Sequence, residues 1–173
     1  MYLDYLIRND SDSIKKFLWK LHPAVRIEAG DELNTSAQWA RVVDPAYSRF
    51  NSLETFPWPW IEGTDASRVP GKGQDMDFFF LWKSKTPEMN FVSGNGKYLF
   101  SVQYDQSIFP FQWYFASYGG FMNHYTAVLE PCTSMPLSVN EAAKLGQCSI
   151  LKPGEKIITT VRIFAGQNKP SVS

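Results

Sequence analysis

The sequence predicts an all-β protein, an antiparallel β-sandwich with one short helix. Most apolar stretches alternate with polar residues at the period of two that strands show, and only one segment carries signals for both ends of a helix. Residues 51–74 are interrupted by proline and glycine, as long loops are. Alternating strands with one apolar and one polar face are typical of two packed antiparallel layers.

In the first part of the chain we expect strands over residues 2–7, 16–21, 25–28 and 32–34. The polar cluster 9–13 predicts a turn after the first strand. His22-Pro23 interrupts the second strand, and Gly30-Asp31 predicts a turn before the fourth. These segments are short, which suits a meandering sheet.

The middle of the chain is less regular. Pro45 reduces residues 41–47 to an edge strand or loop, and the prolines and glycines of 51–74 exclude a regular element there. Loops of this length in a compact domain are usually functional. Trp58 and Trp60 lie between its prolines, where they either form a platform for stacking on sugars or pin the loop to the body.

The remaining strands are expected over residues 76–82, 89–92, 97–104, 112–116, 125–130 and 156–164. The predicted helix has Ser138 as its N-cap, Glu141 completing a capping box, and Gly146 after its end. We therefore expect one β-sandwich domain over residues 1–166 and a frayed tail over 167–173.

Composition limits the ligands. Seventeen basic and seventeen acidic residues cancel, and no basic stripe predicts a nucleic-acid or anionic-membrane surface. No apolar run reaches the roughly 20 residues that cross a bilayer. The 6 Trp, 8 Tyr and 13 Phe exceed what a core of this size needs, so neutral, hydroxyl-rich ligands fit best.

Two cysteines, Cys132 and Cys148, could form a disulfide in a secreted protein. The first residues lack the basic start and apolar run of a signal peptide. We therefore expect a cytoplasmic protein with two free, buried thiols.

Residues 124–130 are the most informative segment. In a strand, His124 and Glu130 share one face with Thr126 and Val128, while the other face is apolar. Pro131 is expected to stop strand pairing after Glu130 and so to place this carboxylate at an accessible strand end.

Neutral-sugar sites combine aromatic faces with carboxylates and amides, and a histidine with a carboxylate suits acid–base chemistry near neutral pH. The candidate residues are His22, Trp58, Trp60, Asp75, Gln112, Trp113, His124 and Glu130. Taken singly, each has a structural alternative: Glu130 could be solvated, His22 could pack in a loop, and Asp75 could cap a turn.

The order of several short motifs resembles aldose 1-epimerase-like (galactose mutarotase-like) proteins. Trp19-Lys-Leu-His22-Pro-Ala resembles the Trp-x-x-His-Pro-Ala segment of that family, and Gly73-Gln-Asp75 resembles its Gly-x-Asp segment. Leu129-Glu130-Pro resembles its Leu-Glu-Pro signature, and Leu151-Lys-Pro-Gly154-Glu155 resembles its Leu-x-Pro-Gly-Glu ending. The spacing of the last two is the most specific part of the resemblance.

The resemblance implies roles by position. Glu130 would be the general base for the anomeric hydroxyl, His22 the general acid for the ring oxygen, and Asp75 a ligand of sugar hydroxyls. No metal or redox cofactor is implied. The two catalytic side chains are expected to face each other across a gap one hexose wide. The resemblance assigns no role to His124.

Only the C-terminal half of such a protein is represented, and nothing matches the Asn-Arg segment or second histidine of the N-terminal half. Half a sandwich would expose sheet edges and apolar faces, so we expect a homodimer or association with a separate N-terminal half. A non-catalytic carbohydrate-binding module and an accessory domain of a sugar-processing assembly remain the alternatives to an epimerase.

Overall fold

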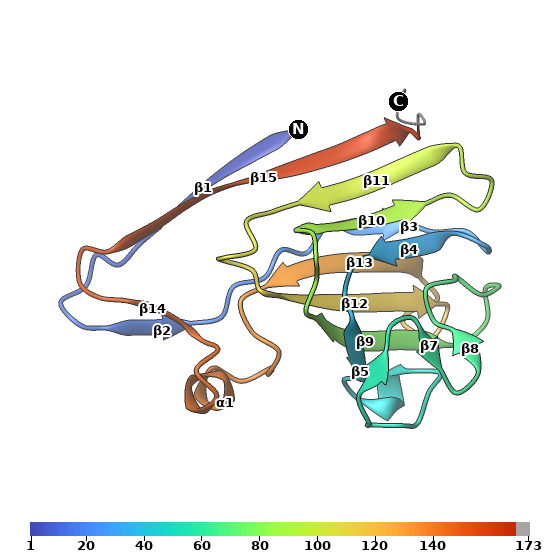
Figure 1. Cartoon of the computed structure of the whole chain (residues 1–173), viewed down its shortest axis with the longest axis horizontal. Coiled ribbons are helices and arrows are strands. Elements are labelled where there is room, and N and C mark those ends of the chain that lie inside the picture. The colour runs from blue at the N-terminus through green and yellow to red at the C-terminus, as the bar shows by residue number, and fades with distance from the viewer. Residues whose placement is uncertain (169–173) are drawn as a thin grey trace.

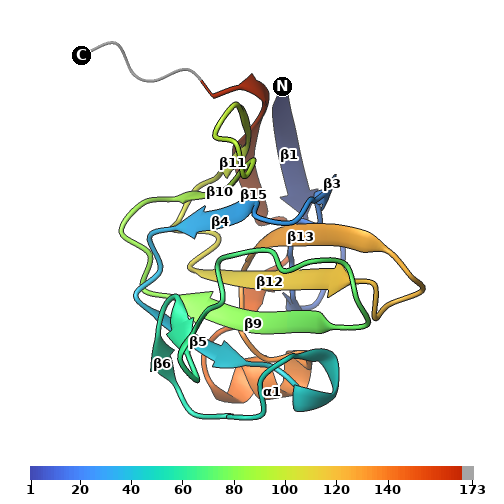
Figure 2. The same ribbon diagram turned by 90° about the vertical axis from the view of Figure 1, so that its right-hand side faces the viewer.

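The protein is a sandwich of two antiparallel sheets in this computed structural model, which describes residues 1–168 (Figure 1). The five-stranded sheet runs β1 (Tyr2–Arg8), β15 (Lys156–Gln167), β11 (Tyr98–Gln103), β10 (Glu88–Val92) and β4 (Glu32–Thr35). The six-stranded sheet runs β3 (Ala24–Arg26), β13 (Tyr125–Cys132), β12 (Phe111–Tyr118), β9 (Met76–Trp82), β5 (Trp39–Val42) and β6 (Phe56–Pro57). Viewed at right angles, β4 and β10 lie above β12, β13 and β9 as separate layers (Figure 2).

Two small ribbons complete the strands: β14 (Ser149–Leu151) pairs with β2 (Lys15–Phe17), and β7 (Trp60–Ile61) pairs with β8 (Thr64–Asp65). The all-β prediction is thus confirmed. The prediction that residues 51–74 contain no regular element was wrong, because β6, β7 and β8 lie there. These strands are only two residues long and show no periodicity in the sequence: β7 and β8 pair with each other in a tight hairpin, and β6 pairs with β5.

Other boundaries also differ from the sequence prediction. The expected strand 16–21 is β2 followed by an isolated bridge at Lys20. Within the irregular stretch 41–47, β5 ends at Val42, and Pro45 begins the short 3₁₀ helix η1 (Pro45–Tyr47). Asp44 caps η1 by accepting a hydrogen bond from the Ala46 N–H. A prolyl ring fits this first helical position because it has no N–H to satisfy.

The single helix is α1 (Val139–Lys144), where the sequence predicts it. Ser138 is its N-cap residue, but its side chain makes no capping hydrogen bond, so the predicted capping box was wrong. Gly146 adopts a φ of 68° just after the helix, as a helix-terminating glycine does. The helix therefore ends by backbone conformation and begins without side-chain support.

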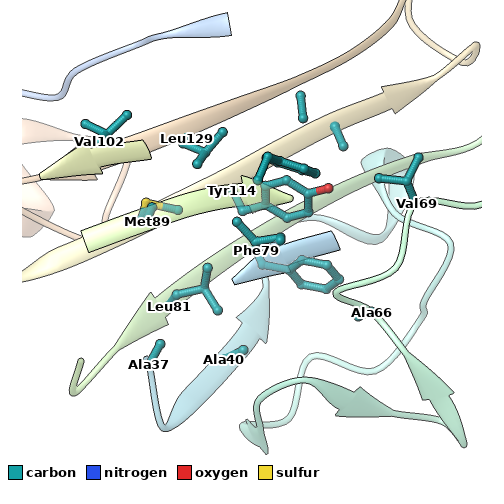
Figure 3. Packing of buried hydrophobic residues seen from close by; sticks show 14 of the residues in the cluster. Ala37, Ala40, Ala66, Val69, Phe79, Leu81, Met89, Val102, Tyr114 and Leu129 are labelled. Carbon is teal, nitrogen blue, oxygen red and sulfur yellow. The ribbon is translucent and has the colours of Figure 1, made fainter. Parts of the chain in front are cut away.

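The core lies between the two sheets (Figure 3). Alternate residues of the six-stranded sheet, among them Phe79, Tyr114 and Leu129, are fully buried there. Met89 and Val102 meet them from the five-stranded sheet. This packing uses one face of each strand. The opposite face of the six-stranded sheet, here called the outer face, carries a second, smaller buried cluster that includes Phe80, Trp113 and Cys132.

A buried polar cluster interrupts this apolar core. The carboxylate of Asp77 on β9 is fully buried and accepts hydrogen bonds from Arg49 Nη2 at 2.6 Å and Nε at 3.1 Å. The Tyr118 hydroxyl donates to the same carboxylate at 3.0 Å and lies 3.3 Å from the Tyr114 hydroxyl. Burial raises the pKa of Asp77, while the hydrogen bonds from Arg49 oppose that rise. The cluster thus ties the 45–50 segment to the sheet.

Buried tyrosines predict loss of stability in alkali. Burial raises the pKa of Tyr104 to about 12, from 10.0, and also raises those of Tyr114 and Tyr118. Because the unfolded chain ionises its tyrosines first, stability should be full below about pH 10 and fall as the pH rises toward about 12. Circular dichroism against pH, with tyrosinate absorbance, measures this. Tyr104→Phe should make the decline less steep, and an unchanged slope would contradict the assignment.

At the C-terminal end, Gln167 belongs to β15, and the Asn168 N–H donates to the Lys97 carbonyl at 2.8 Å. The predicted frayed tail therefore starts too early at 167, and residues 169–173 lie outside the described residues. Within residues 1–168, no helix is both long and apolar enough to cross a membrane.

Candidate functional site

The candidate site lies on the outer face of the six-stranded sheet, at Glu130. Glu130 pairs with Trp113 across β13 and β12, so both side chains point away from the core. The neighbouring residues Leu129 and Tyr114 point inward. The alternation seen in the sequence is therefore what turns this carboxylate away from the core.

The sequence predicts Glu130 at an accessible strand end, and this prediction was wrong. Strand β13 continues through Pro131 to Cys132, and the Glu130 side chain is only 2% exposed. The backbone groups of Pro131 face the 20–23 segment, where its carbonyl accepts a hydrogen bond from the Leu21 N–H at 3.0 Å. Because proline has no N–H, only the bond that this N–H would donate to the same segment is lost. The proline thus removes one hydrogen bond to that segment and leaves pairing with β12 intact.

His22 lies directly beside Glu130. The pairs that flank it, Lys20 with Cys132 and Ala24 with Val128, put His22 opposite Glu130 in register. Its Nε2 is 3.8 Å from Glu130 Oε1, and the His22 side chain is 61% exposed. The structure therefore brings together an exposed imidazole and a buried carboxylate from segments far apart in the sequence.

Lys20, which no motif in the sequence singles out, completes this site. Its Nζ lies 2.9 Å from Glu130 Oε2 and 4.1 Å from the centre of the Trp113 ring. The ammonium lacks hydrogen-bond alignment, so within the described residues Oε2 has no hydrogen-bond donor. Lys20 is two residues before His22, and strand alternation could have placed both on the face of Glu130.

Cys132 lies next to this carboxylate on the same face. Burial raises the pKa of its thiol well above the ordinary value, and the Glu130 carboxylate adds to the rise. Because the thiolate is the nucleophilic form, Cys132 is suited to packing and not to covalent chemistry. Cys148 is also free and is half-buried.

The predicted gap of one hexose between His22 and Glu130 is not present. A separation of 3.8 Å leaves no room for a sugar ring between the two groups. Open space lies beside them instead: a cavity of about 190 Å³ is lined by Lys20, Trp113 and Leu137, among others. A second cavity of about 420 Å³ shares Leu137 and includes Arg41. A ligand would therefore approach the pair from one side.

Gln112 does not belong to this site. It pairs with Pro131 and points inward, where its amide nitrogen donates to the Tyr104 hydroxyl and its oxygen accepts from Thr35 Oγ1 at 2.6 Å. Its side chain is buried between the sheets, and its position next to Trp113 explains why the two face opposite ways. Gln112 is a satisfied core amide.

Asp75 and His124 lie at the other end of these strands. The Tyr118 N–H donates to the Asp75 carbonyl at 2.9 Å, so Asp75 is level with Tyr118, five residues along β12 from Trp113. That spacing corresponds to about 17 Å. His124 precedes β13, on the face of Glu130 but six residues away, beside Phe121. The structure does not bring either residue to Glu130.

Trp58 and Trp60 do not form a platform at this site. The Trp58 ring packs edge-on against Phe79 at 5.7 Å, within the core. Trp60 is exposed in the ribbon of β7 and β8. Of the two alternatives, the structure supports pinning of the loop for Trp58. Within residues 1–168, no group of three or more His, Cys, Asp or Glu side chains could hold a metal ion.

Sequence comparisons find no relative of this chain. It matches no protein-family model and no curated protein. Its fold, in contrast, is shared with several solved structures.

A protein of Klebsiella pneumoniae assigned as an aldose 1-epimerase superposes on 96% of this chain with a TM-score of 0.74 and 13% identity. An Escherichia coli K12 protein with the same assignment superposes on 96% with a TM-score of 0.71 and 13% identity. A TPR-domain containing protein of Parabacteroides distasonis superposes on 98% with a TM-score of 0.69 and 10% identity. The chain therefore has the galactose mutarotase-like fold.

The chain spans about half the length of the epimerase-like structures, 43% of the Klebsiella protein and 56% of the E. coli protein. It spans 28% of the Parabacteroides protein. The resemblance to one half of a mutarotase-like sandwich is thus confirmed at the level of fold.

Proposed function

We propose that this chain is a carbohydrate-active protein that interconverts hexose anomers in the manner of an aldose 1-epimerase. The observation that carries the proposal is the contact between His22 and Glu130 beside the Trp113 ring. An imidazole and a carboxylate are the groups that acid–base chemistry on a hemiacetal needs, and an indole provides an apolar wall for the sugar. The shared fold of proteins assigned as aldose 1-epimerases supports it.

The chemistry assigns one proton transfer to each group. Glu130 takes the proton of the anomeric hydroxyl while His22, in its protonated form, gives a proton to the ring oxygen. The bond between C1 and the ring oxygen then breaks and leaves an open-chain aldehyde. Rotation about the C1–C2 bond and the reverse proton transfers close the ring as the other anomer.

Access to Glu130 requires movement of the side chains that cover it. Lys20 and His22 are the exposed members of the site, whereas Glu130 and Trp113 are buried. A sugar hydroxyl entering from the adjacent cavity would replace Lys20 Nζ at Oε2, the carboxylate oxygen without a hydrogen-bond donor. The covering residues are thus the exposed ones, and the sugar hydroxyls have to take over the contacts that Lys20 makes with the buried carboxylate.

A non-catalytic carbohydrate-binding module is the second candidate, and two observations favour it. The buried Glu130 carboxylate already forms an ion pair with Lys20. The same fold also occurs within a TPR-domain containing protein, and a fold alone does not specify a reaction. In this case Trp113 and the polar groups around it would hold a sugar without opening its ring.

The two candidates separate by one experiment. Freshly dissolved α-anomers of glucose and galactose are followed by optical rotation with and without the protein, and binding is measured in parallel by saturation-transfer NMR. Faster relaxation to the anomeric equilibrium is the expected result. Binding without faster relaxation would favour the module, and neither binding nor acceleration for any hexose tested would refute both.

For protein partners we propose a second copy of this chain or a separate chain carrying the other half of the sandwich. The five-stranded sheet ends on β1, a seven-residue strand, and the six-stranded sheet ends on β3. Open sheet edges favour pairing with further strands.

A further inference from the structure

Strand β1 is an open edge of the five-stranded sheet, and its backbone N–H and C=O groups point alternately toward β15 and away from the sheet. The Met1 amino group and carbonyl both bond to Ile163 of β15, so odd-numbered residues of β1 direct their backbone groups toward β15. In an antiparallel ladder the intervening residues face the other way. The N–H and C=O groups of Tyr2, Asp4, Leu6 and Arg8 therefore point out of the sheet at its edge.

This edge lacks the proline, the bulge and the short length with which proteins often block strand pairing, and its two exposed charges, Asp4 and Arg8, are of opposite sign. It is longer than an average strand and contains no proline, and it is the last strand of its sheet in both views (Figures 1 and 2). Leu6 is 62% exposed on the outward face of the sheet, and Tyr2 is exposed on the same face four residues earlier. A long edge strand with unpaired backbone groups and an exposed leucine between charges of opposite sign can pair with another strand.

We propose that β1 pairs with β1 of a second copy of this chain, antiparallel and centred on Leu6. A two-fold axis through Leu6 places Asp4 opposite Arg8 of the second copy, and Arg8 opposite its Asp4. Each of these pairs, and the pair of Leu6 residues, joins positions with outward-pointing backbone groups. Every such pair exchanges two backbone hydrogen bonds.

Charge selects this register over its neighbours. Pairing centred on Asp4 would place two carboxylates opposite each other, which is destabilising. Pairing centred on Tyr5 would set each Asp4 against a leucine. Centring on Leu6 gives two opposite-charge pairs around an apolar pair, and Arg8, which already contacts Asp10, has enough N–H donors for a second carboxylate.

The pairing joins the two five-stranded sheets into one and leaves the outer face of the six-stranded sheets free. Tyr5 and Ile7 are both half-buried on the inner side of β1. In the dimer, Tyr5 of one copy lies opposite Ile7 of the other. The contact thus covers apolar surface on both faces of the edge without involving Glu130 or His22.

Equilibrium sedimentation over a range of protein concentrations tests the proposal. The wild-type chain should be dimeric at high concentration, and Leu6→Lys should raise the dimer dissociation constant about 10-fold or more because two ammonium groups face each other. The matched control is Ile158→Lys, since Ile158 pairs with Leu6 on β15, has the same outward face and is 61% exposed. Equal effects of both variants, or a wild-type monomer at every concentration, would overturn the proposal.

The register has its own test. Leu6→Cys should form an intermolecular disulfide under mild oxidation in a Cys148→Ser background, because paired residues lie at a distance that disulfides span. Tyr2→Cys, equally exposed on the same strand, should not. Asp4→Lys should weaken the dimer, and Arg8→Glu added to it should restore the dimer. Cross-linking through Tyr2, or no restoration, would contradict pairing centred on Leu6.

Discussion

Glu130→Gln is expected to lower the rate of anomer interconversion by about 10²–10⁴-fold. The substitution keeps the shape of the side chain but removes the carboxylate that acts as the general base in the proposed reaction. His22 alone can protonate the ring oxygen but cannot at the same time take the proton of the anomeric hydroxyl. Optical rotation with a pure α-anomer measures the rate, after subtraction of the spontaneous reaction.

Glu141→Gln is the matched control, because Glu141 is an exposed carboxylate on α1 at the neighbouring cavity. It should leave the rate unchanged. Retained sugar binding by Glu130→Gln, shown by saturation-transfer NMR, separates loss of chemistry from loss of the site. Full activity of a folded Glu130→Gln protein would show that this carboxylate is not the base.

Asp77→Ala is expected to destabilise the fold by about 3–5 kcal/mol, the cost of breaking a buried ion pair from one side. The substitution leaves the largely buried Arg49 guanidinium without its carboxylate and removes the acceptor of the Tyr118 hydroxyl. Urea unfolding followed by circular dichroism measures the change in the free energy of unfolding.

Asp75→Ala is the control for this variant, since Asp75 is exposed two residues earlier and should change stability by less than about 0.5 kcal/mol. The double variant Asp77→Ala, Arg49→Met should be more stable than Asp77→Ala alone, because it removes the unpaired charge. A loss for Asp77→Ala no larger than that for Asp75→Ala would mean that the pair contributes little to stability.

Local patterns in the sequence were sufficient to predict the strands that form the body of the sandwich. Residues 76–82 form a nearly continuous apolar run and residues 125–130 are mostly apolar, as is typical of strands that are buried on both faces. The single helix was also visible, although its N-cap was assigned a hydrogen bond that Ser138 does not make. Two-residue strands such as β7 leave no periodic trace and were missed.

The site was predictable in part for the same reason. Alternation put Glu130 on the outer face, and the motif order suggested His22 as its partner. The positions of the other residues depend on cross-strand register, that is, on which strands pair and at which residues. The register places Lys20 against the carboxylate and Asp75 at the far end of the sheet. Gln112 was assigned to the wrong face because β12 is apolar on both faces, so the sequence does not show which of its alternate side chains point into the core.

By itself the sequence determined which residues alternate, and therefore that this chain forms antiparallel layers with a histidine and a carboxylate on strand-like segments. The tertiary structure alone decided that His22 and Glu130 stand 3.8 Å apart and that Lys20 covers them. Periodicity is a property of neighbours along the chain. Distances across a sheet arise from pairing between residues more than a hundred positions apart, which no local pattern encodes.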